Sequence, residues 1–382
     1  MREFYLPTRI ITGIDCFDSL GQRVAELGSR AMLVCGTHSL RASGQLDRAQ
    51  KLLRDAQVEL VLYDAVTDEP TLDIVQAGLD MARQHEVEAI IGIGGGSAMD
   101  AAKAIAGLYT HRGTVDDYFG KLRQVSGGGL PWVAVPTTAG TGAEVTKNAV
   151  LKSPRHEAKS SLRHDGWYAT VALVDPVLTL SAPPKVTAAS GSDALTQAIE
   201  AYTSVAASPI TDALASDGIA RIGRSLARAC EDGDDIDARA DMLYGSTITG
   251  MAFANARLGA VHGMAHPLGY RYHIPHGIVC GLLLPYTMEY NTEYAECKYA
   301  RVAQLLGVDT RGLDARTAAE RGVEQIRELF AKAGIPAHLR SFGVEEEDLP
   351  VIASESMPSG SLKHNARPLN EKDVQTILRA AL

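Results

Sequence analysis

Four of the eleven histidines in this sequence fall within one stretch of fifteen residues, at positions His262, His266, His273 and His276. Imidazole is the commonest metal ligand in proteins, and it also titrates near neutral pH. His262 and His266 are four residues apart, so on a helix their side chains share one face. The cluster therefore predicts a metal site or an acid–base centre, whereas a single histidine would more simply be a hydrogen-bonded core residue.

The residues around the histidines indicate how the chain turns. Pro267 and Gly269 are expected to bend or end the helix that carries the first two histidines. His276 lies between a proline and a glycine. A tight turn there would bring its imidazole back toward His262, so that both could face one site.

An acidic residue far upstream could complete such a site. Asp193 lies in an amphipathic segment, 190–202, and Gln197 follows one turn later on the same face. An acid in the middle of a helix is usually solvated. The alternative is a carboxylate that joins His262 and His276 around a metal ion.

The elements that would position these residues differ between the two halves of the chain. Short apolar segments at 31–35, 58–63, 89–93 and 132–135 alternate with helical patterns at 46–56 and 71–85. This alternation favours a mostly parallel sheet with helices on both sides. From Val186 onward the patterns are mostly helical, at 190–202, 212–230, 241–256, 294–306, 317–333 and 371–382. We therefore predict an α/β domain at 1–182 and an all-α domain at 183–382.

A run of glycines follows the expected strand 89–93, at the strand end where sheets of this kind bind ligands. Backbone amides of such a run can approach an anion closely, and the helix that starts near Ser97 directs its positive end toward it. The run matches neither GxGxxG nor a Walker loop, and a purely conformational turn is the alternative. The predicted phosphate-binding residues are Gly94, Gly95, Gly96, Ser97 and Asp100.

Two further loops bear on the same ligand. The loop after strand 132–135 contains Thr137, Thr138 and Thr141. Threonines in turns usually satisfy local backbone groups, but two such loops at successive strand ends favour a dinucleotide over a lone phosphate. After strand 31–35, an acidic residue would repel a ribose 2′-phosphate, whereas this chain has Gly36 and then Ser39. NADP is therefore admitted, and a simple Gly/Ser turn is the alternative.

Composition limits the possible partners. The 382 residues carry a formal net charge of −9, which argues against a nucleic acid or an anionic membrane surface as the main partner. No apolar run reaches the length of a membrane span, and the first residues lack the apolar core of a signal peptide. The five cysteines form no CxxC pair, which suits a reducing cytoplasm as the predicted location.

Five ordered motifs resemble the iron-containing (group III) alcohol dehydrogenase family over nearly the whole chain. They are GGGSAMDAAKAIA at 94–106, PTTAGTGAEVT at 136–146, Lys159 ahead of VALVDP at 171–176, DALTQAIEAY at 193–202, and GAVHGMAHPLG with IPHG between 259 and 277. The resemblance implies a nucleotide-binding α/β domain followed by a helical domain, as in the dehydroquinate-synthase-like superfold, with the active site in the cleft. It also implies a homo-oligomer, commonly a dimer, for which residues 4–11 could serve.

The resemblance also implies site residues. The nicotinamide cofactor, NAD or NADP, would be held by Gly95, Gly96, Ser97, Thr137, Thr138 and Lys159. The family's metal ligands fall on Asp193, Gln197, His262 and His276, and His266 matches a histidine near the nicotinamide and the substrate. Gln197 departs from the family motif, which has histidine there. A glutamine amide is a poorer ligand for Fe²⁺ or Zn²⁺ than imidazole, although three strong ligands can hold a catalytic zinc.

The expected function is therefore an NAD(P)-dependent alcohol dehydrogenase, equally an aldehyde or ketone reductase. A divalent metal would polarise the substrate oxygen, with His262 and His266 as the catalytic histidines. The expected substrate is a small alcohol or carbonyl compound. Two alternatives stay open: a lyase of the related superfold, and a dinucleotide-binding protein that has lost catalysis because of Gln197.

Overall fold

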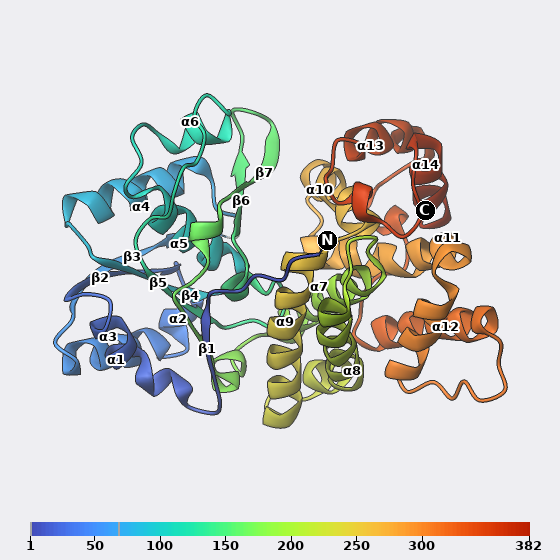
Figure 1. The fold of residues 1–382 in the computed structure, drawn as a ribbon, viewed down its shortest axis with the longest axis horizontal. Coiled ribbons are helices and arrows are strands. Elements are labelled where there is room, and N and C mark those ends of the chain that lie inside the picture. Colours follow the sequence, from blue (N-terminus) through green and yellow to red (C-terminus); the bar gives the residue numbers. More distant parts are fainter. Residues whose placement is uncertain (1, 68) are drawn as a thin grey trace. The chain divides into compact units, whose positions relative to one another are not determined.

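The computed structural model describes residues 2–67 and 69–382, and it divides into two compact units (Figure 1). The α/β unit comprises Leu6–Thr138 and Gly142–Ser181, and the helical unit comprises Ala182–Leu382, Ala139–Thr141 and the N-terminal residues up to Tyr5. The two short segments of the helical unit differ from the predicted domains. The N-terminal segment groups with the helices because the backbone amide of Tyr5 donates a hydrogen bond to Asn255 Oδ1 at 2.8 Å.

The α/β unit is built on a six-stranded sheet whose neighbouring strands all run parallel. The strand order is β1 (Arg9–Thr12), β8 (Val171–Val174), β5 (Trp132–Pro136), β4 (Ala89–Gly94), β2 (Arg30–Gly36) and β3 (Glu59–Val66). The four inner strands are buried at nearly every residue. They therefore form continuous apolar segments in the sequence instead of alternating ones, and the predicted parallel fold is confirmed.

Helices cover both faces of this sheet (Figure 1). On one face, α1 (Leu20–Ala25), α2 (Ser39–Ala42) and α3 (Gln45–Asp55) contribute Leu20, Leu40 and Leu46 to a buried cluster with strand residues. α4 (Leu72–Gln84) packs beside α5 (Gly96–Leu108) on the other, where a Cβ on Gly92 of β4 would meet α5. The unit also contains α6 (Val115–Phe119) and an antiparallel pair, β6 (Asn148–Ser153) and β7 (Ala158–Arg163).

The winding of the sheet reverses at β2 and β4. β3 adds on one side of β2, whereas β4, β5 and β8 follow one another on the other side. The carboxyl ends of β2 and β4 therefore border the place where open α/β sheets bind their ligands. These two strands end at Gly36 and Gly94, so both strand ends lack a side chain there.

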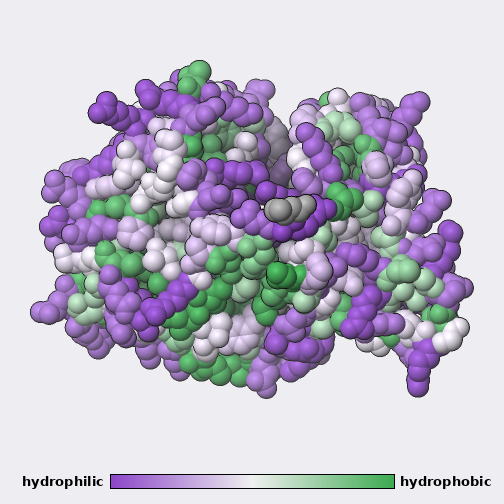
Figure 2. Space-filling model, in the orientation of Figure 1, coloured by the Kyte–Doolittle hydropathy of each residue, from purple (hydrophilic) through white to green (hydrophobic). Residues whose placement is uncertain are grey.

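The helical unit consists of α7 (Pro184–Thr203), α8 (Pro209–Glu231), α9 (Ile236–Ala256), α10 (Ala260–Tyr272), α11 (His276–Leu305), α12 (Ala315–Lys332), α13 (Leu349–Ser356) and α14 (Glu371–Ala380). α7 packs against α8, α9 and α11 and is buried along most of its length. The surface seen in Figure 2 is mostly hydrophilic, with smaller apolar patches between. None of the helices in the described residues is long and apolar enough to cross a bilayer.

The structure corrects part of two expectations about helix boundaries. α10 does not end at Pro267 or Gly269 but continues to Tyr272, followed by His273 in the left-handed conformation with φ 54°. Proline inside a helix removes one hydrogen bond, and packing of the buried residues before it outweighs that loss. The backbone of Ala295 is not helical and divides α11 into two stretches, of which the second corresponds to the predicted helix 294–306. The first stretch, which begins at His276, was missed because it is buried on nearly all sides and has no polar face.

Candidate active site

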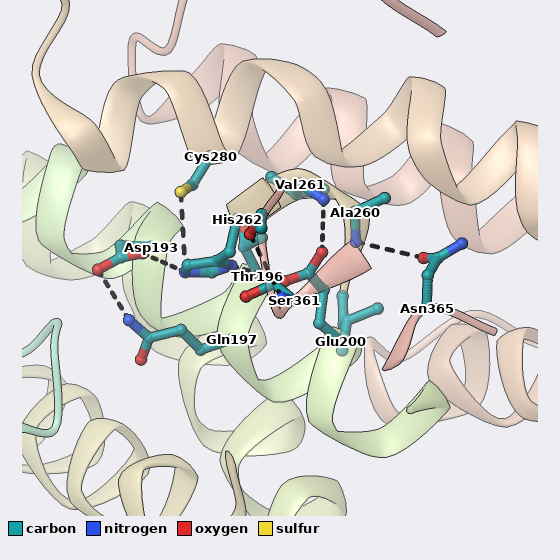
Figure 3. Close-up of polar contacts among 12 residues, drawn as sticks. Asp193, Thr196, Gln197, Glu200, Ala260, Val261, His262, Cys280, Ser361 and Asn365 are labelled. Atoms are coloured by element: carbon teal, nitrogen blue, oxygen red, sulfur yellow. Dashed lines mark hydrogen bonds and ion pairs between the residues drawn. The ribbon is translucent and has the colours of Figure 1, made fainter. Parts of the chain in front are cut away.

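Ligand atoms from three helices converge on one point in the helical unit. They belong to Asp193 of α7, His262 of α10, and His276 and Cys280 of α11, and they all lie within 4.8 Å of one another. Asp193 Oδ1 is 3.2 Å from His262 Nε2 and 3.9 Å from His276 Nε2. Cys280 Sγ is 3.9 Å and 3.7 Å from the same two nitrogens. Figure 3 shows Asp193, His262 and Cys280 directed toward one another from separate helices.

Local sequence explains how α11 delivers two ligands. His276 and Cys280 are four residues apart in the first turns of α11, so they share one face. Gly277 between them has no side chain and lies directly against α7 near Ala189. The hydroxyl of Ser192 donates a hydrogen bond to the Gly277 carbonyl at 2.8 Å, next to Asp193 in the chain. The contact between α7 and α11 therefore brings the three ligands together.

The spacing and the chemistry of these donors fit a divalent metal ion. Tetrahedral zinc sites have ligand distances of about 2.0–2.3 Å, which places neighbouring donor atoms about 3.3–3.6 Å apart. The four distances between donors given above run from 3.2 to 3.9 Å. One carboxylate, two imidazoles and one thiol are ligand types suited to Zn²⁺ and similar transition metals.

Glu200 orients the histidine at the centre of the cluster. Its Oε2 lies 2.5 Å from His262 Nδ1, and its Oε1 accepts a hydrogen bond from the Val261 amide at 2.7 Å (Figure 3). A carboxylate at Nδ1 fixes the tautomer that leaves Nε2 free to act as a ligand. Sequence reasoning missed Glu200. It follows Asp193 by seven residues, two turns along the same helix face, and this spacing was the available signal.

The charges around the cluster attract a cation. Burial would raise the pKa of Asp193, but the hydrogen bond with His262 and the charges of His276 and His262 hold it below its ordinary value. Burial would lower the pKa of His262, but the negative charges of Cys280 and Glu200 and the hydrogen bond with Asp193 raise it well above its ordinary value. The buried carboxylates thus favour positive charge at this point, which a metal ion can supply.

The predicted ligand set is brought together in part. The donors of Asp193, His262 and His276 meet, whereas Gln197 directs its amide nitrogen to Asp193 Oδ2 at 2.9 Å (Figure 3). The amide oxygen of Gln197 is buried and has no hydrogen-bond partner in the described part of the chain. Cys280 joins the cluster although the sequence reasoning did not propose it. Its spacing of four residues from His276 repeats that of His262 and His266.

His266 lies one turn beyond His262 on α10. Its ring stacks on that of His276, with centroids 5.6 Å apart and planes inclined by 21°. The rings of His262 and His276 are 5.4 Å apart. The three imidazoles are therefore neighbours, and His266 lies at the edge of the ligand cluster.

The glycine and threonine loops lie together at the carboxyl edge of the sheet. Gly94 is opposite Pro136 at the ends of β4 and β5, and its carbonyl accepts a hydrogen bond from the Thr137 amide at 2.9 Å. Gly94 has φ +149°, which residues with side chains rarely adopt, and a Cβ on Gly95 would lie 3.2 Å from Thr138 Oγ1. α5 starts at once, with Gly96 and then Ser97, so an anion at this loop would lie at the N-terminus of a helix.

Two other predicted cofactor residues have partners within the fold. Lys159 Nζ lies 2.8 Å from Glu69 Oε1, and together with a nearby lysine it lowers the pKa of that carboxyl, against the effect of burial, to about 2. Asp100 accepts a hydrogen bond from the Val150 amide at 3.0 Å. These contacts fasten β7 and β6 to their surroundings.

The remaining predicted residues lie at loop positions. Gly36 ends β2 and Ser39 begins α2. The neighbouring Arg41 is engaged in a 2.7 Å ion pair with Asp64. Thr141 lies in the segment 139–141, which groups with the helical unit instead of the α/β unit.

Replacing Glu200 by glutamine should weaken zinc binding about 10- to 100-fold, the usual effect of losing a carboxylate behind a ligating histidine. The amide keeps the size of the side chain but no longer attracts the Nδ1 proton with a full charge. The apparent Kd for Zn²⁺, measured by competition with a chelating dye, checks this. Glu355→Gln, at an exposed ion pair with Arg271 of the same unit, is the control. Equal affinities of the two variants would contradict the role of Glu200.

Comparisons with known proteins identify the family of this chain. Residues 7–176 match the sequence model of iron-containing alcohol dehydrogenase, and residues 187–382 match that of the Fe-containing alcohol dehydrogenase family, C-terminal. Long-chain-alcohol dehydrogenase 1 of Geobacillus thermodenitrificans (strain NG80-2) is 40% identical over 372 residues, covering 97% of this chain and 94% of its own. 1,3-Propanediol dehydrogenase of Citrobacter freundii is 38% identical over 383 residues, covering 100% and 99%.

A solved structure extends the similarity to three dimensions. The crystal structure of a 1,3-propanediol oxidoreductase matches with a TM-score of 0.96 at 38% identity, covering 100% of both chains. Matches of this length include both the sheet and the helical unit. The chain therefore belongs to the iron-containing alcohol dehydrogenase family and is an oxidoreductase that acts on alcohols.

Proposed function

We propose that this enzyme holds a divalent metal ion through Asp193, His262 and His276 and interconverts an alcohol with its aldehyde or ketone. The convergence of these donor atoms within one buried cluster is the observation that supports the proposal most strongly. When bound, the metal supplies a Lewis acid for the reacting oxygen, and the nicotinamide supplies or takes up the hydride. Fe²⁺ and Zn²⁺ are the ions proposed.

The side chains around the cluster supply orientation and proton transfer. Glu200 keeps the proton of His262 on Nδ1, so that Nε2 remains directed at Asp193. His266, stacked beside His276, is the group we assign to accept the hydroxyl proton of the alcohol and to return it in the reverse reaction. Loss of that proton must accompany hydride loss for the carbonyl to form.

The cofactor is proposed to bind at the glycine residues that end strands of the α/β unit. Gly94, Gly95 and Gly96 present backbone amides without side chains, and α5 begins at this point. The pyrophosphate would therefore lie at a helix N-terminus, with hydroxyl groups of Ser97, Thr137 and Thr138 nearby in the chain. Either NAD or NADP is admitted, because Gly36 itself carries no acidic side chain and Asp64 of the neighbouring strand is paired with Arg41.

Relatives named for propanediol and for long-chain alcohols suggest primary alcohols as the first substrates to test. A cytoplasmic location and a homodimer stay predictions. Strand β1 is an edge strand with β8 as its partner in the sheet, and an edge strand offers unpaired backbone groups to a second copy.

Turnover of NADH and NADPH with a panel of aldehydes and ketones tests the function. We expect oxidation of the reduced cofactor, loss of the rate after chelation, and recovery when Fe²⁺ or Zn²⁺ is added. Full turnover in rigorously metal-free protein would remove the ion from the mechanism. Dinucleotide binding without oxidation across the panel would favour the two alternatives, a lyase or a protein that has lost catalysis.

Substitution of Gly36 by aspartate should raise the KM for NADPH by roughly 10- to 100-fold and leave that for NADH nearly unchanged, because a carboxylate repels a 2′-phosphate. The side chain can be added without strain, since the contact closest to a new Cβ is the Val66 carbonyl at 3.6 Å. Steady-state kinetics with both cofactors provide the measurement. Gly36→Asn, of equal size but neutral, is the control, and equal losses in both variants would show that charge is not involved.

A further inference from the structure

The ligand cluster contains a thiol that the mechanism above does not use. Cys280 is buried, and its sulfur is 3.7 Å from His276 Nε2 and 3.9 Å from His262 Nε2. Asp193 Oδ1 lies at similar distances from the same two nitrogens, 3.2 Å from His262 and 3.9 Å from His276. The sulfur is therefore the fourth donor atom of the cluster, beside those of Asp193, His262 and His276.

Gln197 does not place its amide oxygen among these donor atoms. Its amide nitrogen donates a hydrogen bond to Asp193 Oδ2, and an NH₂ group has no lone pair for a metal. The oxygen of this amide points away from Asp193 (Figure 3), and it has no hydrogen-bond partner in the described residues. In this position Gln197 supports the carboxylate and leaves the other Asp193 oxygen, Oδ1, facing the histidines.

We propose that Cys280, as a thiolate, is the fourth protein ligand of the metal, and that Gln197 positions Asp193 from outside the coordination sphere. This inference rests on the proposed metal-dependent function and specifies its ligand set as one carboxylate, two imidazoles and one thiolate. On binding, the S–H bond breaks, the proton passes to solvent and a sulfur–metal bond forms, with no change of oxidation state.

The ligand set has a consequence for metal choice. Thiolate is a soft ligand that favours Zn²⁺ and similar transition metals over hard ions such as Mg²⁺. A glutamine oxygen as the fourth ligand would instead favour hard ions such as Mg²⁺. The chain has an amide at position 197, where the family's motif has an imidazole, and the proposed fourth ligand is a sulfur from the first turns of α11.

Titration of the metal-free, full-length protein with Co²⁺ tests the proposal without recourse to activity. A cobalt–thiolate bond gives an intense sulfur-to-metal absorption band in the near ultraviolet, whereas oxygen and nitrogen ligands give only weak visible bands. We expect the wild-type protein to show this band at one Co²⁺ per chain. Cys280→Ser should lose it and bind Co²⁺ at least tenfold more weakly. Cys297→Ser, which changes an exposed thiol of α11, should keep it.

Further outcomes separate this inference from the proposed function. Gln197→Ala should retain the sulfur band, because the amide is not a ligand. Co²⁺ binding without a sulfur band in the wild type would overturn the thiolate ligand even if Cys280→Ser fails to fold. Metal-dependent turnover with no sulfur band would leave the proposed function intact and refute only the ligand set. Absence of Co²⁺ binding together with metal-independent turnover would refute both.

Discussion

Asp193→Asn should lower kcat/KM for alcohol oxidation by about a thousandfold and leave the purified protein depleted of metal. The substitution removes the carboxylate from the donor cluster of Asp193, His262, His276 and Cys280. Lewis-acid stabilisation of the reacting oxygen is worth several kcal/mol. About 4 kcal/mol corresponds to three powers of ten in rate, since each 1.36 kcal/mol is a factor of ten.

The size of this effect follows from the position of Asp193. Its Oδ1 faces His262 and His276, and its Oδ2 is held by Gln197. Asparagine keeps the shape but presents a neutral amide to the histidines, so the cation loses a negatively charged ligand. Steady-state kinetics and metal content per chain are the measurements.

A second carboxylate of the helical unit provides the control. Asp241 of α9 pairs with Arg221 and Arg224, neither of which belongs to the ligand cluster. Asp241→Asn removes the same charge and should leave both metal content and kcat/KM near the wild-type values. Normal metal content and activity in Asp193→Asn would mean that Asp193 does not hold the ion.

Gly277→Ala should destabilise the helical unit by about 3 kcal/mol, at the upper end for an overpacked contact, and weaken metal binding. A Cβ at this position would lie 1.9 Å from the carbonyl oxygen of Ala189 and 2.6 Å from its carbon. Both groups are backbone, so neither can rotate away, and α11 must withdraw from α7. His276 and Cys280 then move away from Asp193, because they flank Gly277 on α11.

The midpoint of urea unfolding and the Zn²⁺ affinity measure the two parts of this prediction. Gly360→Ala is the matched control, because a Cβ there meets nothing within 4 Å and the backbone is not in a conformation reserved for glycine. The control should unfold at the wild-type midpoint or slightly above it. An unchanged midpoint and affinity in Gly277→Ala would contradict the close contact between the two helices.

Part of the molecule could be predicted from local pattern. The apolar segment 89–93 followed by three glycines predicted a buried strand, a loop and a helix, and β4 and α5 confirm that prediction. Burial on both faces requires a run of apolar residues, and a backbone bend such as that at Gly94 requires glycine, so both leave a signal in the sequence. The amphipathic helix 71–85 was recognisable as α4 for the same kind of reason.

Other features depend on neighbours that are remote in the sequence. Pro267 was expected to bend or end a helix, but α10 does not end there, because it is packed among other helices. Lys159 was expected to hold the nicotinamide cofactor, yet it pairs with Glu69, whose proximity no local pattern reveals. A side chain's partner is set by the packing of whole elements, so residue type and spacing alone could not supply it.

The sequence by itself determined the class of fold, the strand–glycine–helix loop at 89–97, the histidine cluster and the family, because each depends on residue types at fixed short spacings. The tertiary structure alone decided which donors meet: it places the Cys280 sulfur beside the donor atoms of Asp193, His262 and His276, turns the nitrogen of Gln197 toward Asp193, and sets Glu200 behind His262. The physical reason is that α7, α10 and α11 contribute one or two groups each, and only their packing, closest at Gly277, brings those groups within bonding distance of one ion.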